Sequence, residues 1–568
     1  MFEVTEVSIA ALRAALASGQ TTSADLVRAY LARVEAFDGA DTPTALNAVV
    51  VRNPAALDEA QAADERRARG ATLGPLDGIP YTAKDSYLVK GLTAASGSPA
   101  FAHLVAQRDA FTIERLRAGG AICLGKTNMP PMANGGMQRG VYGRAESPYN
   151  GDYLTAPFAS GSSNGAGTAT AASFCAFGLA EETWSSGRGP AANNGLCAYT
   201  PSRGLISVRG NWPLTPTMDV VVPFARTMAD LLEVLDVIVA PDPDTRGDLW
   251  RLQPWVPIPA VETVRPSSYP QLAVGPQGLA GKRFGVPRMY INADPEAGTS
   301  EAPGIGGPTG QPITTRASVI ALWQEARRAL EAAGAEVLEV DFPLVSNCEG
   351  DRPGAPTVFN RGLVSAEFLH HELWELSAWA FDDFLRANGD PALNRLVDVE
   401  GALIFPHDPG TLPNREGDLA AGMDEYVRMA ERGIAPWHEI PTLEAGLRGL
   451  EQTRRLDLED WMTALGLDAV VFPTVADVGP ANADVDPAAA DIAWSNGVWV
   501  ANGNLAIRHL GVPTVTVPMG IMADIGMPAG LTFAGRAYDD SSLLRLAAAF
   551  EATGSRRQIP PRTPPLQH

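Results

Sequence analysis

Short apolar runs that alternate with helical segments limit the fold of this chain more than any other feature of its sequence. Residues 468–472 (Asp-Ala-Val-Val-Phe) and 513–517 (Pro-Thr-Val-Thr-Val) have the composition of strands buried on both faces. Further strands are predicted over 78–85, 121–124, 282–286 and 336–340. Helices are predicted within 5–36, 55–69, 111–118, 231–238, 320–333, 350–450 and 543–550. Strands and helices that alternate along the whole length predict an α/β protein.

The domain organisation is expected to be simple although the chain has 568 residues. The sequence contains no internal repeat and no clear interdomain linker, so one large domain is predicted over 1–555, with helical insertions around 292–450. Residues 556–568 are rich in proline and arginine and are predicted to form a flexible tail.

Charge and composition narrow the class of partner. Lys and Arg number 44 and Asp and Glu 65, which gives a formal charge of −21. Such an acidic chain is a poor non-specific partner for nucleic acid or an anionic membrane. No apolar run reaches the roughly 18 residues that span a bilayer, and the N-terminus lacks the basic start of a secretory signal. We therefore predict a cytoplasmic protein without a nucleic-acid or membrane partner, and its four cysteines are expected to be buried and reduced.

Two short motifs suggest chemistry that their contexts contradict. Residues 120–127 (Gly-Ala-Ile-Cys-Leu-Gly-Lys-Thr) match the G-x-x-x-x-G-K-[ST] phosphate-loop pattern, but the four intervening residues are strand-like and no helix follows. Residues 161–165 (Gly-Ser-Ser-Asn-Gly) match the G-x-S-x-G nucleophile elbow with Ser163 as nucleophile. The segment before them is a weak strand, and no histidine follows a strand with an acidic partner. Neither a nucleotide site nor an elbow hydrolase is favoured.

A third constellation lies between Phe158 and Asn194, where two Ser-rich, Gly-punctuated turns flank a small-residue helix. A serine hydroxyl becomes a nucleophile when a base lies beside it, so such turns suit a site built from hydroxyls and backbone. Residues 160–165 read Ser-Gly-Ser-Ser-Asn-Gly, and 180–192 read Ala-Glu-Glu-Thr-Trp-Ser-Ser-Gly-Arg-Gly-Pro-Ala-Ala. Upstream, 78–85 read Gly-Ile-Pro-Tyr-Thr-Ala-Lys-Asp.

These blocks resemble the amidase signature family of serine hydrolases, whose motifs read roughly G-x-P-x-x-x-K-D, G-G-S-S-G-G and G-T-D-T-G-G-S-I-R-x-P-A-A. Aligning Pro-Ala-Ala puts the family's nucleophile on Ser186, 24 residues after Ser162, which is the family's spacing between its two serines. Similar blocks lie at 125–129, 200–204, 219–227, 472–474, 511–513 and 528–536, so the resemblance spans roughly 8 to 553. It implies one large, twisted, mixed β-sheet flanked by helices on both faces, with residues 1–555 as the catalytic domain.

The resemblance also implies a Ser-Ser-Lys triad that needs no metal and no cofactor. Lys84 would be the base, Ser162 the proton shuttle and Ser186 the nucleophile of an acyl-enzyme reaction. A lysine acts as a base only when it is neutral, and the apolar run before Lys84 suits the burial that lowers a lysine pKa.

The turn around the nucleophile is implied to stabilise the oxyanion. Backbone N–H groups of Thr183, Trp184, Ser185 and Ser186 would receive the negative charge. Two further residues, Glu182 and Arg188, match the family's Asp and Arg and would brace the turn.

This sequence departs from the family at the same turn. Trp184 and Ser185 stand where the family has two glycines, and Asn164 replaces a third. Trp184 would be strained if its position needed a positive φ. The chain is therefore a divergent member, and its substrate is not to be taken from better-known ones.

The predicted function is hydrolysis of carboxylic amide C–N bonds, with a small hydrophobic or aryl amide as substrate. Met132, Gln138 and Tyr142, together with aromatic residues near Trp374, are the predicted acyl pocket. Cleavage of an ester, carbamate or hydrazide would use the same site. Open alternatives are a catalytically silent binding protein, a homodimeric assembly and an amidotransferase subunit.

Overall fold

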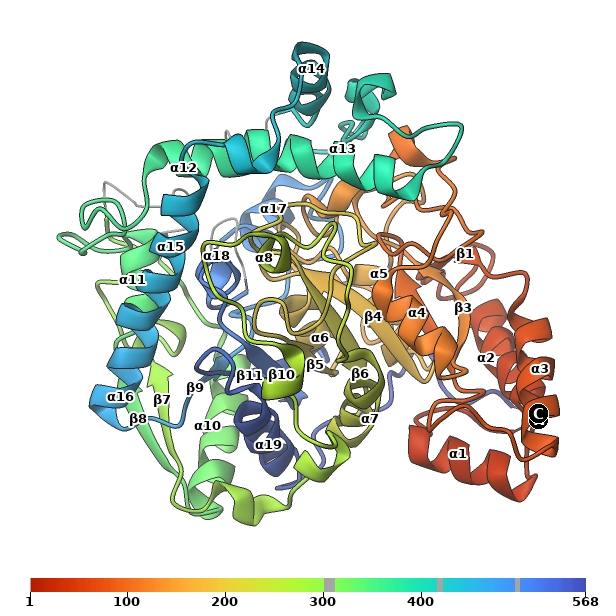
Figure 1. Ribbon diagram of the computed structural model, residues 1–568. Coiled ribbons are helices and arrows are strands. Elements are labelled where there is room, and N and C mark those ends of the chain that lie inside the picture. Colours follow the sequence, from red (N-terminus) through yellow and green to blue (C-terminus); the bar gives the residue numbers. More distant parts are fainter. Residues whose placement is uncertain (1, 301–311, 416–421, 496–500, 568) are drawn as a thin grey trace.

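Eleven strands form one mixed sheet within the residues that the computed structural model describes, 2–300, 312–415, 422–495 and 501–567 (Figure 1). Their order across the sheet is β1-β3-β2-β4-β6-β5-β10-β11-β9-β7-β8. The strands are β1 Val49–Arg52, β2 Pro80–Lys84, β3 Ile122–Thr127, β4 Phe177–Glu182, β5 Cys197–Thr200, β6 Val220–Ala225, β7 Arg283–Pro287, β8 Glu336–Val340, β9 Ala469–Pro473, β10 Thr514–Ile521 and β11 Pro528–Ala534.

Pairing directions explain where a site can form. Strand β2 runs parallel to both β3 and β4, whereas β4 pairs with β6 antiparallel. The carboxyl ends of β2 and β4 therefore meet at one edge of the sheet, and such edges are where open α/β sheets place their ligands. The predicted α/β class and the single mixed sheet are confirmed.

Helices surround the sheet on both faces (Figure 1). Their bounds are α1 Ile9–Ser18, α2 Ser23–Phe37, α3 Ala56–Ala68, α4 Phe111–Ala118, α5 Asn164–Ala171, α6 Arg188–Asn193, α7 Met228–Ile238, α8 Leu249–Leu252, α9 Val261–Val264, α10 Ala317–Ala332, α11 Pro343–Glu349, α12 Ala366–His371, α13 Ser377–Asn388, α14 Asp424–Arg432, α15 Leu443–Arg454, α16 Trp461–Leu465, α17 Pro487–Ala493, α18 Asn504–His509 and α19 Asp540–Glu551.

Close packing puts α5 and α6 on one face and α7 and α19 on the other. A Cβ at Gly178 of β4 would lie 2.5 Å from Thr170 Oγ1 of α5, so only glycine allows this approach. Gly530 of β11 faces α6 in the same way, whereas Phe533 of β11 contacts Phe550 of α19. The two serine turns of the sequence lie at the starts of α5 and α6, and both are therefore on the same face.

Local signals in the sequence account for several helix ends. Thr22 caps α2, with its side-chain oxygen accepting the Asp25 N–H at 3.1 Å, as the capping box predicts. Gly19 ends α1 in the left-handed conformation that glycine adopts without strain.

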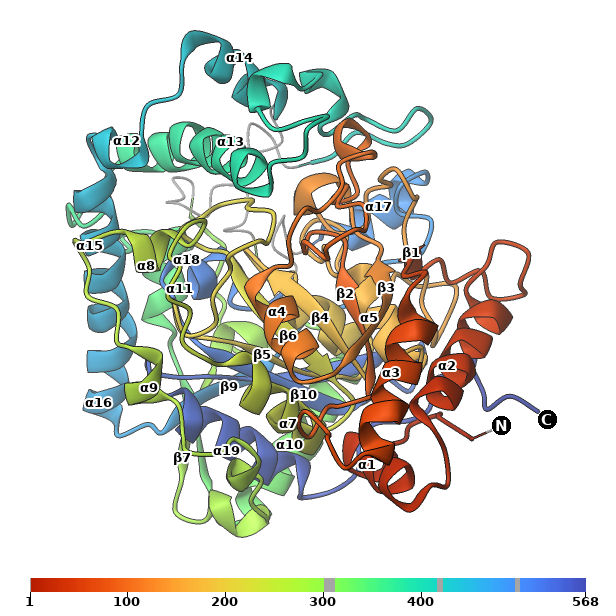
Figure 2. The same ribbon diagram turned by 45° about the vertical axis from the view of Figure 1, so that its right-hand side comes forward.

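A separate helical layer lies over one end of the sheet. Figures 1 and 2 show α12, α13 and α14 grouped there, within the predicted helical insertions. A π-helical turn over Glu372–Leu376 joins α12 to α13. Aromatic contacts hold the layer down, because Trp212 packs against Phe381 and Phe384 of α13 with ring centroids 5.6 and 4.0 Å apart.

The segment after residue 555 differs from the predicted flexible tail. Arg557 forms an ion pair with Glu6 at 2.7 Å and donates to the Gly195 carbonyl at 2.8 Å. Arg33 donates to the Thr563 carbonyl at 2.8 Å, and Thr563 is buried. The arginines that made this segment look disordered are the residues that attach it to the domain.

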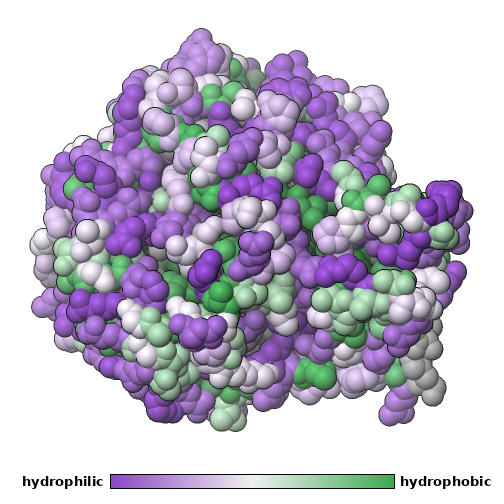
Figure 3. Space-filling model, turned by 60° about the horizontal axis from the view of Figure 1, so that its bottom comes forward, coloured by the Kyte–Doolittle hydropathy of each residue, from purple (hydrophilic) through white to green (hydrophobic). Residues whose placement is uncertain are grey.

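The surface offers small, scattered apolar sites. The large hydrophobic residues exposed among the described residues are Leu73, Val141, Leu403, Leu456, Leu465, Val485, Ile492 and Ile559. Figure 3 shows hydrophilic and hydrophobic residues interspersed over the face that it presents. No helix in the described part of the chain is long and apolar enough to cross a membrane.

Candidate active site

Lys84 and Ser162 meet at the carboxyl edge of the sheet. Lys84 is the last residue of β2, and Ser162 lies two residues before α5. The Lys84 Nζ is 2.7 Å from Ser162 Oγ, and both side chains are buried. The sequence separates these residues widely, but the end of a strand and the start of a helix that packs on it bring them into hydrogen-bond contact.

Ser186 lies beside Ser162 at the turn between β4 and α6. The Ser162 N–H donates to Ser186 Oγ at 3.1 Å. The three residues of the predicted triad therefore lie together in one buried cluster.

The environment of Lys84 suits a base. Burial lowers the pKa of Lys84 to about 8, against the opposing attraction of nearby carboxylates, of which Glu181 is the strongest. Glu181 Oε2 is 4.0 Å from Lys84 Nζ. An appreciable fraction of Lys84 is therefore neutral near neutral pH.

Glu182 and Arg188 brace the turn that carries Ser186. Glu182 Oε2 accepts the N–H groups of Gly187 and Arg188 at 3.0 and 2.8 Å, and its Oε1 is 2.9 Å from Arg188 Nε. Arg188 also donates to the Trp184 carbonyl at 2.6 Å. This buried ion pair fixes both ends of the turn, in the position where the sequence predicts a supporting pair.

The turn itself is open to an anion. No described residue accepts a hydrogen bond from the N–H groups of Thr183, Ser185 or Ser186. Neither Trp184 nor Ser185 has a positive φ, so the strain that glycine replacement could have caused at Trp184 is not found. Instead, the Trp184 side chain joins an apolar cluster with Phe158 and Trp494 that closes one side of the site.

Thr183 is held by a buried carboxyl group. Its Oγ1 donates to Asp219 Oδ1 at 2.6 Å. Burial raises the pKa of Asp219 to about 7. The hydrogen bond fixes the first residue of the proposed oxyanion turn against the loop that precedes β6.

The two discounted motifs have structural roles. The Ser163 hydroxyl donates to the Glu181 carbonyl at 3.0 Å and so ties α5 to β4. Gly125, Lys126 and Thr127 lie in β3 and not in a phosphate loop. Lys126 Nζ is buried, 3.2 Å from Asp85 Oδ1, and donates to the Thr93 carbonyl at 2.9 Å.

Glu181 is the residue of this cluster that sequence reasoning missed. It lies next to Glu182 in β4, and adjacent strand residues point to opposite faces, so only one of the two acids can brace α6. That alternation is the signal that could have identified it. The Glu181 carboxylate accepts hydrogen bonds from Ser86 and Asn211, and burial raises its pKa.

The predicted pocket residues are dispersed. Gln138 lines a cavity of about 350 Å³ beside Phe158, together with residues 405–414. Met132 is buried in the main core, and Tyr142 is half-buried with its carbonyl bound to Asn47; neither lines a cavity found among the described residues. Trp374 packs against Tyr426, whereas Trp379 and Phe384 of the neighbouring α13 line a second cavity, described below.

Nothing in the described residues forms a group of three or more His, Cys, Asp or Glu side chains that could hold a metal ion. All four cysteines are buried and free. The chemistry available to this cluster is that of two serine hydroxyls, one lysine and the backbone.

Comparison with known proteins gives the same direction. A family model described as Amidase matches residues 25–273. One component of the glutamyl-tRNA(Gln) amidotransferase of Xanthobacter autotrophicus is 28% identical over 568 residues, which cover 98% of each chain. The peptide amidase of Stenotrophomonas maltophilia is 28% identical and superposes with a TM-score of 0.72 over 98% of each chain. A bacterial aryl acylamidase of the amidase signature family, 19% identical with a TM-score of 0.66 over 97% of this chain and 96% of its own, shows a likeness of fold.

The chain belongs to the amidase signature family, as its motifs predict. It is an amidase-family hydrolase, of the class that acts on amide C–N bonds.

Proposed function

We propose that the protein is a serine amidase in which Ser186 is the nucleophile, Ser162 the proton shuttle and Lys84 the base. The observation that carries the proposal is the chain of contacts from Lys84 Nζ to Ser162 Oγ, 2.7 Å, and from Ser162 N to Ser186 Oγ, 3.1 Å. Distances of this size are those over which a positioned base takes a proton.

The first half of the reaction forms an acyl-enzyme. Ser186 Oγ attacks the amide carbonyl carbon and gives its proton to Ser162 Oγ, while Ser162 gives its own proton to neutral Lys84. The proton then returns through Ser162 to the leaving nitrogen, because an amine leaves readily only when it is protonated. An amine or ammonia departs, and an ester on Ser186 remains.

The second half restores the enzyme. Water attacks the ester, its proton passes along the same relay to Lys84, and the relay then protonates Ser186 as the acid leaves. The negative charge on the carbonyl oxygen would be stabilised in both halves by the N–H groups of the turn over 183–186. Support for this role comes from Thr183, Ser185 and Ser186, whose N–H groups have no acceptor among the described residues.

A small hydrophobic or aryl amide is the substrate class that the surroundings favour. Apolar side chains of Trp212, Leu214, Trp379 and Phe384 line a cavity that reaches Thr183. Esters, carbamates and hydrazides remain possible substrates of the same machinery, and the cytoplasmic location and the homodimer stay predictions.

A panel of anilides, primary amides, carbamates and esters tests the proposal. Wild type is expected to hydrolyse at least one amide, and Ser186→Ala and Lys84→Ala to lose that activity. Ser163→Ala is the matched control, because its hydroxyl is bound to a backbone carbonyl and is expected to be dispensable. Full amide hydrolysis by Lys84→Ala would refute the role of Lys84 as base.

A second candidate is an amidotransferase subunit that passes ammonia to a partner. It is favoured by relatives such as the matching component of the glutamyl-tRNA(Gln) amidotransferase of Chloroflexus aurantiacus, 29% identical over 97% of each chain. The charge of −21 opposes direct contact with tRNA, so another protein would have to hold it. Co-purification of a tRNA-binding partner from the native host would favour this candidate over a stand-alone hydrolase. If a fluorophosphonate failed to label the protein, the silent binding protein would be favoured over both.

A further inference from the structure

A narrow cavity adjoins the proposed catalytic cluster on the side of Glu181. It lies between the loop of residues 207–220 and α13, and Glu181, Thr183 and Asp219 line its inner end. Thr183 belongs to the proposed oxyanion turn, so a group in this cavity would be directly connected to a carbonyl bound at Ser186.

The inner end of the cavity presents hydrogen-bond acceptors. The Glu181 side chain keeps 11% of its surface exposed although it accepts hydrogen bonds from Ser86 and Asn211. Asn211 also lines the cavity, is only 8% exposed, and its Oδ1 has no hydrogen-bond partner among the described residues. A buried acceptor without a partner is costly, and a ligand that donates hydrogen bonds would satisfy it.

The walls and size of the cavity limit what can reach these acceptors. Trp212, Leu214, Trp379 and Phe384 make the walls largely apolar. The cavity holds about 50 Å³. Because one water needs about 10 to 15 Å³ of such space, there is room for roughly four groups of that size. A short chain with one polar end fits better than a bulky or doubly charged group.

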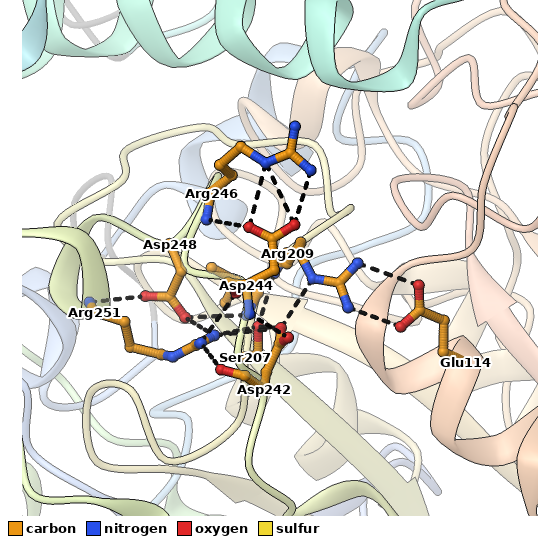
Figure 4. A network of polar contacts seen from close by, with 9 residues as sticks. Glu114, Ser207, Arg209, Asp242, Asp244, Arg246, Asp248 and Arg251 are labelled. Atoms are coloured by element: carbon orange, nitrogen blue, oxygen red, sulfur yellow. Dashed lines mark hydrogen bonds and ion pairs between the residues drawn. The ribbon is translucent and has the colours of Figure 1, made fainter.

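The rim does not repel a cation, although Arg209 and Arg246 belong to the lining. Figure 4 shows that carboxylates surround these arginines and the neighbouring Arg251. Arg209 pairs with Glu114 and Asp242 at 2.7 and 2.9 Å, and Arg246 with Asp244 at 2.8 Å.

Asp248, the fourth carboxylate of the network, is 3.5 Å from Arg251. The network therefore sets three arginines against four carboxylates. Arg108 and Asp383 add one charge of each sign to the lining.

We propose that this cavity selects amides whose acyl part ends in a short alkylammonium group, with the ammonium donating to Glu181 and to Asn211 Oδ1. The inference rests on the proposed serine amidase function. The acyl part is the one assigned to the cavity because it stays attached to Ser186 until water attacks, whereas the amine must leave first.

Binding of such a group would also favour catalysis. A cation beside Glu181 shares the carboxylate that otherwise attracts Lys84, 4.0 Å away. The ammonium form of Lys84 then loses part of its stabilisation, and the neutral base is favoured. The correct substrate would thus help to deprotonate the lysine that acts on it.

Two primary amides of equal length test the proposal. 4-Aminobutanamide carries three methylenes and an ammonium beyond the carbonyl, and pentanamide carries three methylenes and a methyl. Wild type is expected to prefer the cationic amide in kcat/KM by about tenfold or more, as a hydrogen bond to a charged group implies. Glu181→Gln is expected to bring the ratio of the two kcat/KM values close to one, and Ser163→Ala to keep the wild-type ratio.

The ratio within each variant is the informative quantity, because any effect of Glu181 on Lys84 acts on both amides. If neither amide is turned over, their competition against fluorophosphonate labelling of Ser186 gives the same ratio. A wild-type ratio of one or less overturns the proposal and needs no folded variant. A preference that persists in folded Glu181→Gln also overturns it. Absence of labelling at Ser186 would instead refute the serine amidase function itself.

Discussion

Replacing Glu181 by glutamine should move the pH dependence of amide hydrolysis to lower pH. The wild-type enzyme needs neutral Lys84, whose pKa is lowered to about 8, so kcat/KM for a neutral amide should rise with pH and level off above that value. At pH 6 only about 1% of a base with that pKa is neutral. Glutamine removes the negative charge that stabilises the Lys84 ammonium, and the pKa of Lys84 must then fall.

The distance sets the size of this effect. Two unit charges 4.0 Å apart interact by about 4 kcal/mol at an effective dielectric constant of 20. This is an upper bound, because Glu181 also accepts hydrogen bonds from Ser86 and Asn211 and its own pKa is raised by burial. One third of it, about 1.4 kcal/mol, already corresponds to one pH unit.

The assay is kcat/KM for a neutral amide between pH 5.5 and 10, for wild type, Glu181→Gln and Ser163→Ala. We expect the acid limb of Glu181→Gln to lie at least about one pH unit below that of wild type. The control Ser163→Ala should follow the wild-type curve. An acid limb that stays in place or moves upward in a folded Glu181→Gln would refute the reasoning, because it would mean that the carboxylate does not act on Lys84.

Three further predictions concern the relay, the brace and the C-terminal segment. Ser162→Ala should lower kcat by about 10²- to 10⁴-fold, the usual contribution of a proton-transfer group, while Ser163→Ala stays within about twofold in the same steady-state assay. Arg188→Met should destabilise the protein by about 3 to 5 kcal/mol in urea unfolding, because it leaves the buried Glu182 carboxylate without its partner; a loss below about 1 kcal/mol would contradict the brace. Removal of residues 555–568 should lower the thermal unfolding temperature measurably, and an unchanged temperature would restore the interpretation of this segment as a flexible tail.

The catalytic cluster could be predicted from sequence because each of its members lies inside a short contiguous motif. Lys84 ends a strand, and Ser162 and Ser186 lie just before helices, so local order and spacing carried most of the information. The long helices were predicted for a similar reason, since helical periodicity and caps are local, as Thr22 shows for α2.

Strand β4 was not predicted, and with it the role of Glu181. Its sequence, Phe-Gly-Leu-Ala-Glu-Glu, lacks β-branched residues and ends in two acids, so no local signal favoured a strand. Tertiary packing decides this segment, because Gly178 is required by the close approach of Thr170, and β4 lies between β2 and β6.

The cavity beside Glu181 was equally beyond local reasoning. Its walls join Trp212, which follows β5, to Phe384 of α13, and only the folded chain brings these rings to 4.0 Å. The predicted pocket concentrated on the loop after β3, of which Gln138 alone among the three predicted residues lines a cavity.

Labelling with a fluorophosphonate, followed by peptide mass spectrometry, tests the central claim most directly. The account predicts that the label is found on Ser186, that Ser186→Ala is not labelled, and that Lys84→Ala is labelled far more slowly at pH 8 than wild type. Labelling at Ser162 or Ser163, or an equal rate in Lys84→Ala, would contradict the assignment of Ser186 as nucleophile and Lys84 as its base.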